Sequence, residues 1–353
     1  MDISPKTSRE VYHGEAGSYH LWSAADLPML GVSEKGAAKL FLEKRGLALP
    51  TFSDSSKIAY VLEGSGTAGM IFPGSPEKVV AVKKGDAIAL PFGIVTWWFN
   101  PNDTHLVVLF LGDTSKAHKS GEFTDFQLTG IFNGFTTEFV SRAWDLPQEE
   151  VSTILNSHVD SIIVKVEDGI DMPEPLTSSS PGFVLNCEEA AFDVNVESGG
   201  RVVVVSSKNL PLVKECGFGG DLVKLDGNAM CSPGFSCDSA FQVTYITKGS
   251  GRVQVVGIGG KKVLETSISE GNLFIVPRFF TVSKIADVDG MEWFSIVTTP
   301  NPVFCNLAGK SSVLKYLSPQ ILQASFDVSS VDAKLFSSKK MEEADTFFPP
   351  PQN

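Results

Sequence analysis

The sequence predicts an all-β protein built from two β-barrels, each followed by a pair of helices. Two observations carry this prediction. Short runs of β-branched and aromatic residues alternate with Gly- and Pro-containing turns along most of the chain, and the same landmarks occur twice in the same order. At 353 residues, the chain is long enough for two domains with full cores.

The internal duplication rests on three collinear matches with offsets of 185, 183 and 186 residues: residues 60–66 recur at 245–251, residues 27–30 at 210–213, and the pair Gly85 and Pro91 at Gly271 and Pro277. Small insertions between two copies of one unit produce such slowly changing offsets. The two halves are therefore expected to share one fold.

Strands are expected wherever β-branched and aromatic residues cluster, at 58–62, 105–111, 242–246, 253–256, 273–276 and 293–297. Gly64, Gly66 and Gly69 fall between or within such runs. Glycine is expected at these positions because a side chain would resist the sharp bend of the strands.

A helical pair is expected after each strand-rich unit. Apolar residues repeat every four positions across residues 131–144, which predicts the first helix. The next helix opens with Asp145 and Pro147, a capping residue and an early proline, and runs through residue 155. In the second half, residues 313–327 and a segment from Ser329 onward repeat this arrangement.

These elements divide the chain into an N-terminal barrel with trailing helices at 1–170, a linker at 171–181, and a C-terminal barrel with trailing helices at 182–353. The linker is expected because residues 171–181 hold three prolines and four consecutive Thr and Ser residues.

The net charge and the hydropathy pattern indicate which kinds of partner and which cellular compartment to expect. A net charge of −12 argues against a nucleic-acid surface. The longest apolar stretches have the length of a strand, so no membrane segment is expected. The first ten residues contain no apolar signal-like region, which favours the cytosol, with a seed protein storage vacuole as the alternative.

The five cysteines show no CxxC spacing, and they are expected to be free, mostly buried thiols in a cytosolic chain. Cys231 and Cys237 lie close enough in sequence to form a small-loop disulfide if the protein matures in an oxidising compartment.

The segment 85–100 carries the motif that identifies the barrel type. Gly85, Pro91, Gly93 and Asn100 follow the spacing G-x5-P-x-G-x2-H-x3-N, with Thr96 at the position of the histidine. This is similar to the second signature motif of the cupin family. The resemblance implies two cupin, or jelly-roll, barrels.

Over its whole length the chain resembles two-cupin seed globulins of the legumin type (the 11S class), and especially their glutelin-like (type-D) members. The resemblance rests on both barrel motifs, on the helix pairs, and on the run Leu185-Asn-Cys-Glu-Glu189. It implies a bicupin protomer, trimers that stack into hexamers, and a role as a nutrient reservoir in seeds. Asn186 is followed by Cys187 where the family has the glycine of its cleavage site, so cleavage into two chains is not expected.

Neither barrel offers the ligands that catalytic cupins use to hold a metal ion. In the first, Lys57 occupies the position of the carboxylate, residues 50–53 contain no histidine, and Thr96 replaces the last imidazole. The matching positions of the second barrel are Gln242 and Val282. A lysine would repel a divalent ion. We therefore expect no metal, no cofactor and no catalytic residues.

One group of residues is a candidate ligand site. Trp97 and Trp98 follow Thr96, and strand alternation places one of them inside the barrel and the other outside. Core packing accounts for them most simply. The alternative is an apolar pocket for a small aromatic carboxylate, with Lys57 as counter-ion and Thr96 as a polar contact.

The sequence thus favours a non-enzymatic seed storage globulin. A hormone-binding cupin for small hydrophobic or aromatic ligands is the alternative, and a metal-dependent cupin enzyme is the least favoured. Assembly into a homo-oligomer, a trimer or a hexamer, is expected because the trailing helices carry more apolar surface than a barrel flank needs, at Phe135, Phe139, Trp144, Leu314, Leu317 and Phe326.

Overall fold

The computed structural model describes residues 2–157, 161–175, 182–338 and 346–351. The chain forms two compact units. Arg9–Leu21 and Glu34–Glu188 make up the first, which we call the N-terminal barrel. Residues 2–8, Trp22–Ser33 and the described chain from Glu189 onward make up the second, the C-terminal barrel. Part of the predicted linker, 176–181, lies outside the described residues, so the division at 171–181 stays a prediction.

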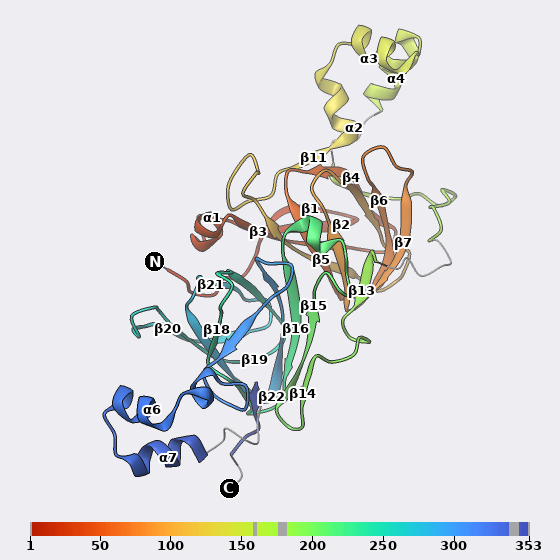
Figure 1. The fold of residues 1–353 in the computed structure, drawn as a ribbon. Helices are drawn as coiled ribbons and strands as arrows, with labels where there is room; N and C mark the ends of the chain where they lie inside the picture. The colour runs from red at the N-terminus through yellow and green to blue at the C-terminus, as the bar shows by residue number, and fades with distance from the viewer. Residues whose placement is uncertain (1, 158–160, 176–181, 339–345, 352–353) are drawn as a thin grey trace. The chain divides into compact units, whose positions relative to one another are not determined.

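Two antiparallel sheets form the N-terminal barrel (Figure 1). The seven-stranded sheet has the order β1 (Arg9–Gly14), β2 (Gly17–Trp22), β3 (Lys35–Leu42), β10 (Leu106–Asp113), β5 (Ser56–Glu63), β8 (Asp86–Leu90) and β13 (Val184–Asn186). The six-stranded sheet has the order β11 (Asp125–Gln127), β4 (Gly46–Ser53), β9 (Val95–Phe99), β6 (Ser65–Ile71) and β7 (Lys78–Lys83), with β12 (Ile163–Lys165) also paired to β4.

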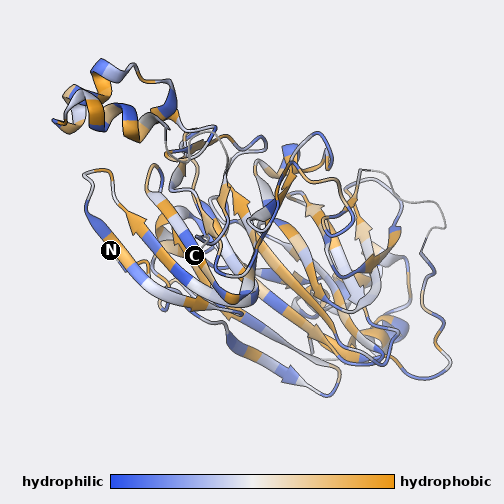
Figure 2. Ribbon diagram, turned by 90° about the horizontal axis from the view of Figure 1, so that it is seen from below, coloured by the Kyte–Doolittle hydropathy of each residue, from blue (hydrophilic) through white to orange (hydrophobic). Residues whose placement is uncertain are grey.

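The inner faces of these sheets bury one continuous apolar core. Leu40, Val61, Ile88 and Val108 from the first sheet pack with Met70 from the second, and each is almost fully buried. Figure 2 shows the alternation of hydrophobic and hydrophilic residues along the strands, which a strand needs when only one of its faces is buried. The prediction of a strand-rich barrel in this half of the chain is confirmed.

The C-terminal barrel is one eleven-stranded sheet that bends back on itself. Its longest strands are β19 (Gln242–Val256) and β22 (Thr281–Val297), which pair along almost their whole length. The other strands are β14 (Val194–Val196), β15 (Gly200–Val205), β16 (Gly219–Leu225), β17 (Met230–Cys231), β18 (Gly234–Ser236), β20 (Lys262–Ser269), β21 (Leu273–Val276), β23 (Phe304–Asn306) and β24 (Phe347–Phe348).

The bend of the long strands depends on glycine. Gly249 has φ +75°, and a Cβ atom there would lie 2.2 Å from the Gly290 carbonyl oxygen. Gly64, at the matching position of the N-terminal barrel, has φ +77°. Only glycine adopts this backbone without strain and permits such a close approach. The two halves therefore share the same backbone conformation at this turn, in addition to the matching sequence around it.

The trailing helices are shorter than the sequence predicts. In place of one helix over 131–144, the structure has α2 (Leu128–Ile131), a 3₁₀ turn η1 (Phe132–Gly134) and α3 (Thr137–Trp144), because Phe135 is extended. The second helix of this pair is α4 (Gln148–Asn156). The C-terminal barrel ends with η2 (Val313–Tyr316), α6 (Pro319–Phe326) and α7 (Ser330–Ser338), and α6 begins directly after Ser318 as predicted.

Two short helices, α1 (Met29–Ser33) and α5 (Val213–Cys216), complete the fold and occupy matching places in the duplicated sequence. Within the part of the chain that the structure describes, none of the helices is both long enough and apolar enough to span a bilayer.

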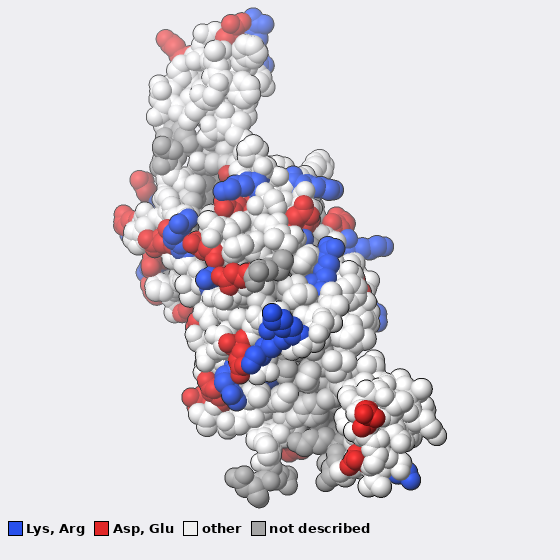
Figure 3. Space-filling view, turned by 90° about the vertical axis from the view of Figure 1, so that its left-hand side faces the viewer, with Lys and Arg blue, Asp and Glu red and all other residues white. Residues whose placement is uncertain are grey.

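Surface charges are mixed. On the face of the molecule shown in Figure 3, Lys and Arg side chains are interspersed with Asp and Glu side chains.

Candidate functional site

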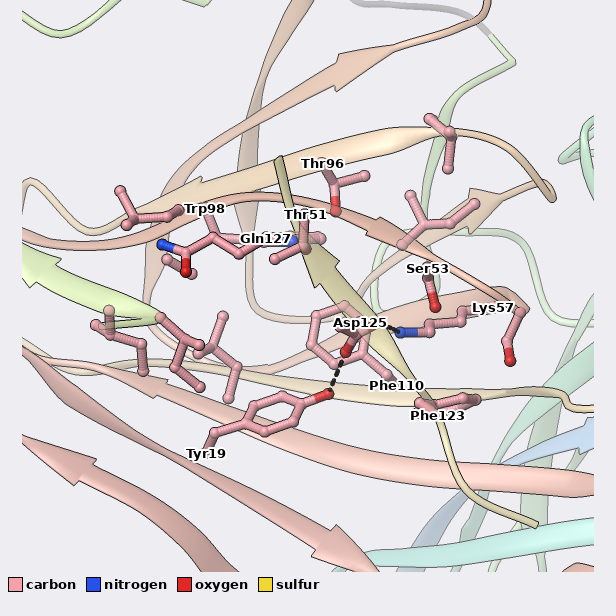
Figure 4. Close-up of a pocket in the computed structure, with 18 residues that line it drawn as sticks. Tyr19, Thr51, Ser53, Lys57, Thr96, Trp98, Phe110, Phe123, Asp125 and Gln127 are labelled. Atoms are coloured by element: carbon pink, nitrogen blue, oxygen red, sulfur yellow. Dashed lines mark hydrogen bonds and ion pairs between the residues drawn. The ribbon is translucent and has the colours of Figure 1, made fainter. Parts of the chain in front are cut away.

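The N-terminal barrel encloses a cavity of about 230 Å³ between its two sheets (Figure 4). Its wall is mostly apolar, with Trp98 on β9, Phe110 on β10 and Phe123 before β11. Polar groups reach it from Tyr19, Thr51, Ser53, Lys57, Thr96, Asp125 and Gln127. An apolar chamber with a few convergent polar groups is the usual form of a small-molecule site.

An ion pair between a buried lysine and a partly exposed aspartate is the main polar feature of this cavity. Lys57 Nζ lies 2.7 Å from Asp125 Oδ1, and the two side chains are only 7% and 24% exposed. Tyr19 donates a hydrogen bond of 3.1 Å from its hydroxyl to Asp125 Oδ2. Figure 4 shows these three side chains converging on one another. Because Asp125 balances its charge, the Lys57 ammonium group is not a free counter-ion.

The pKa values of the cluster reflect burial and this pairing. Burial by itself would raise the pKa of the Asp125 carboxyl, but the charge and hydrogen bond of Lys57 outweigh it, and the net pKa is lowered. Burial, followed by the charge of Asp125, raises the pKa of the Tyr19 hydroxyl well above its usual value. At neutral pH, Asp125 is therefore ionised and Tyr19 is a neutral hydrogen-bond donor.

Aromatic rings complete the surroundings of the ammonium group. Lys57 Nζ lies 4.2 Å from the centroid of the Phe123 ring and 5.7 Å from that of Phe110. Trp98 packs edge-on against Phe110, with their centroids 5.5 Å apart. The faces of these rings attract the Lys57 ammonium group and partly compensate for its removal from water.

The structure brings three of the four predicted ligand residues together. Lys57, Thr96 and Trp98 all line the cavity. Trp97 lies on the other face of β9, where its indole nitrogen donates a 2.6 Å hydrogen bond to Glu77 Oε1. It packs in a separate cluster with Val79 and Phe99. Whether the cavity binds a ligand stays a prediction.

Tyr19 and Asp125 are the site residues that the sequence reasoning did not find. They come from β2 and β11, which lie far from the cupin motif in the chain. Only the pairing of β11 with β4 brings Asp125 to Lys57, with Asp125 opposite Ser53. No local pattern in the sequence marks either residue.

The residues present do not fit a cupin metal ion. A lysine and a threonine, Lys57 and Thr96, occupy positions where the family places a carboxylate and an imidazole, and neither would hold a divalent ion at neutral pH. Within the described residues, no group of three or more His, Cys, Asp and Glu side chains is placed to hold a metal ion.

The interior of the C-terminal barrel contains different polar residues from those of the N-terminal cavity. Lys284, which is 4% exposed, lies with its Nζ 4.2 Å from the centroid of the Trp293 ring. Lys284 stands 186 residues after Trp98, so a buried cation takes the place of an indole. The hydroxyls of Thr244 and Ser295 lie 3.1 Å apart nearby in the same sheet. Gln242, the residue that matches Lys57, donates to Ser236 Oγ at 3.0 Å.

Asp221 is the acidic residue near Lys284 inside the C-terminal barrel. Burial raises the pKa of its carboxyl to about 6, against the opposing influence of the Lys284 charge and of a hydrogen bond with Ser295. Burial likewise lowers the pKa of the Lys284 ammonium group. Both shifts mean that charge is costly inside this barrel.

The five cysteines are free thiols in this structure. Cys231 is buried, and its sulfur accepts a 3.0 Å hydrogen bond from the backbone nitrogen of Lys284. Cys237 is exposed and hydrogen-bonds with a different cysteine, Cys305. The geometry therefore gives no support to the pairing of Cys231 with Cys237, which stays an untested prediction.

The duplicated barrels, the Gly and Pro turns and the motif at 85–100 define the class of protein as a bicupin. The cupin family, described as Cupin, matches residues 4–152 and 185–334, and the chain belongs to it.

Among known proteins, the chain is similar to glutelin type-D 1 of Oryza sativa subsp. japonica, with 26% identity over 87% of this chain and 79% of that protein. It is also similar to the 11S globulin seed storage protein Ana o 2.0101 of Anacardium occidentale, with 26% identity over 83% of this chain and 80% of that protein. The solved structure of an 11S globulin from Wrightia tinctoria, described as revealing an auxin binding site, matches with a TM-score of 0.90 and 25% identity over 99% of this chain and 95% of that chain. The predicted resemblance to bicupin 11S globulins of the legumin type is confirmed.

The expectation of a cytosolic protein is wrong. The relatives are seed storage globulins, which are kept in protein storage vacuoles, so the vacuolar alternative fits better. The lack of an apolar region in the first ten residues does not outweigh this finding.

Proposed function

We propose that this protein is a seed storage globulin, a nutrient reservoir without enzymatic activity. The observation that carries the proposal is its similarity to seed storage globulins across both barrels. The barrel interiors agree with it, because the N-terminal one places a lysine–carboxylate pair where catalytic cupins hold a metal ion. A reserve protein needs compact, protease-resistant packing rather than a reactive centre.

Assembly into a homo-oligomer, a trimer that stacks into a hexamer, is part of this proposal. Several large apolar side chains on the trailing helices are exposed in the single chain, as expected for an interface: Phe135, Phe139, Leu317, Ile321, Phe326 and Leu335. An apolar groove of about 660 Å³ lies between the helices α2 to α4 and the outer side of β4 and β12. Docking of a second copy would cover these surfaces.

Cleavage of the chain is not part of the proposal. The side chain of Asn186 donates to the Lys84 carbonyl at 3.0 Å and to Asp86 Oδ1 at 2.8 Å, and its oxygen accepts from the backbone of Glu188 at 3.0 Å. This asparagine is held within the β13–β8 ladder, which makes it a poor protease site. The reserve is expected to remain one polypeptide.

Two measurements test the storage function. Immunoblots through seed maturation and germination should show accumulation followed by loss, with a single band near 38.0 kDa under reducing conditions. Light scattering on the native protein should give three or six times this mass. A constant low level through germination would contradict the storage function, and a clean monomer would contradict the assembly.

Binding of a small aromatic carboxylate in the N-terminal cavity is the second candidate function. It is supported by the wall of Trp98 and Phe110, and by the similar 11S globulin structure described as revealing an auxin binding site. A carboxylate ligand would have to compete with Asp125 for Lys57. This competition predicts weak binding in the unaltered protein.

The adjacent tryptophans give a matched pair of variants for this test. With indole-3-acetate as the probe in calorimetric titration, Trp98→Ala should weaken binding about tenfold or more, which corresponds to about 1.4 kcal/mol. Trp97→Phe should leave the affinity unchanged, because Trp97 lies outside the cavity. Asp125→Asn should tighten binding by releasing Lys57. Equal effects of the two tryptophan variants would contradict this site.

A further inference from the structure

Two cysteines lie at the end of a short two-stranded ladder in the C-terminal barrel. β18 pairs with β23 in antiparallel register, with Phe235 opposite Cys305 and Ser236 opposite Phe304. The backbone nitrogen of Cys237 donates to the Val303 carbonyl at 3.1 Å, which extends the ladder by one residue. Cys237 and Cys305 are therefore diagonal neighbours on adjacent strands.

Strand alternation places both thiols on the same side of the ladder. Residues two apart on a strand share a face, so Cys237 lies on the face of Phe235. Cys305 lies on that face too, because it stands directly opposite Phe235. On the other face, Ser236 and Asn306 are buried, whereas Phe304 is 44% exposed.

The two thiols are diagonal neighbours on one face, and both reach solvent. Cys237 is exposed and Cys305 is partly exposed, whereas the other three cysteines are buried. A side-chain hydrogen bond with Cys237 is the main cause that raises the pKa of the Cys305 thiol, followed by burial. The Cys237 thiol also lies 3.5 Å from the Val303 carbonyl oxygen.

We propose that Cys237 and Cys305 form a reversible, redox-sensitive disulfide that joins β18 to β23. The inference is independent of the storage function and of the N-terminal cavity. The bond would close a loop that contains β19, β20, β21 and β22, which are the main walls of the C-terminal barrel. Oxidation would therefore restrict the unfolded chain and stabilise this barrel.

The position of the pair explains why the bond is reversible. Diagonal neighbours in a regular ladder have Cα atoms about 7–8 Å apart, whereas disulfides usually span about 4.4–6.8 Å. Closure therefore needs a small backbone shift, which the end of a short ladder allows more easily than its middle. Exposed and strained disulfides are the ones most readily reduced.

The chemistry is thiol–disulfide exchange with a low-molecular-weight disulfide such as glutathione disulfide. The Cys237 thiolate attacks one sulfur of this oxidant, the oxidant's disulfide breaks, and one glutathione thiolate leaves. The Cys305 thiolate then attacks Cys237 Sγ, the Cys237–Cys305 bond forms, and the second glutathione leaves. The two protons of the protein thiols pass to the glutathione thiolates, so the oxidant is reduced by the same two electrons that the protein loses.

The test uses the full chain in glutathione buffers of increasing oxidised fraction. Samples are quenched with acid, alkylated with N-ethylmaleimide, digested and analysed by mass spectrometry. We expect a linked pair of peptides containing Cys237 and Cys305, lighter by two hydrogens than the free peptides, with a yield that rises with the oxidised fraction and falls on return to reduced glutathione.

Three variants sharpen the result. Cys305→Ser should trap glutathione on Cys237 as a stable mixed disulfide, and Cys237→Ser should give no cross-link. Cys216→Ser, which alters a buried cysteine, should keep the cross-link. The unaltered protein should also melt at a higher temperature when oxidised than when reduced, and this difference should vanish in Cys237→Ser. Absence of the linked peptides in fully oxidising buffer, or linkage of Cys237 to Cys231 instead, would overturn the proposal.

Discussion

The Asp125→Asn variant is expected to lose about 3 kcal/mol of unfolding free energy at neutral pH, the lower end of the usual cost of breaking a buried ion pair from one side, because Lys57 is buried and Asp125 is partly exposed. Asparagine retains an oxygen that can accept from Tyr19, but it leaves the Lys57 ammonium group buried and without its counter-ion. Urea unfolding followed by tryptophan fluorescence measures the loss.

The chain contains a matched control for this experiment. Lys44 and Asp103 form an ion pair of 2.6 Å, slightly shorter than the buried one, but their side chains are 60% and 85% exposed. Because water screens such a pair, Asp103→Asn should change stability far less than Asp125→Asn does. The double variant Lys57→Met with Asp125→Asn should recover much of the stability, since no buried charge remains. Equal losses in Asp103→Asn and Asp125→Asn would contradict our account of the cavity.

The same pair predicts an acid dependence. The pKa of Asp125 is lower in the folded protein than in the unfolded chain, so the folded state resists protonation there. The stabilisation by this carboxylate is present above the unfolded pKa of about 3.9 and is lost as the pH falls through the lower folded value. Asp125→Asn should therefore weaken the dependence of stability on pH below about pH 4.

The Asp221→Asn variant is expected to change stability in the opposite direction. Burial raises the pKa of Asp221 from 3.8 to about 6. The folded protein therefore binds this proton more tightly than the unfolded chain, and stability falls as the pH rises from about 4 to about 6. A shift of this size corresponds to about 3 kcal/mol. Partial exposure and the lost hydrogen bond reduce the expected gain for Asp221→Asn at pH 7.5 to about 1–2 kcal/mol.

Stability measured across this pH window gives the test. Asparagine mimics the protonated carboxyl, so the variant and the unaltered protein should be equally stable near pH 4, diverge as the pH rises to about 6, and differ by a constant amount above that. A variant that is less stable than the unaltered protein at pH 7.5 would mean that Asp221 stabilises Lys284 by more than its own burial costs.

The fold could be predicted from the sequence because its strongest constraints are local and repeated. Gly64 and Gly249 mark the same strand bend in both halves, and each has a positive φ. The strands expected around them lie within β5 and β19. The boundaries of the first trailing helix were less accurate, because the extended Phe135 interrupts a segment whose apolar period looks continuous.

The candidate site could be predicted only in part. Motif spacing places Lys57, Thr96 and Trp98 in the barrel, and strand alternation predicts that one of the two tryptophans faces outward. Alternation alone does not tell which tryptophan faces outward. In the structure it is Trp97, whose indole nitrogen donates a hydrogen bond to Glu77. Asp125 could not be found, because its position depends on pairing between strands that are distant in the sequence. This missing partner also changes the role of Lys57 from a free counter-ion to one member of a pair.

The two buried lysines occupy positions that are not equivalent in the two halves. Lys57 lies on β5, and its counterpart in the second half is Gln242, whereas Lys284 lies on β22, and its counterpart is Trp98. Each half therefore holds its own buried ammonium group at a position that the other half fills with a neutral side chain, so a substitution at one site leaves the other unchanged.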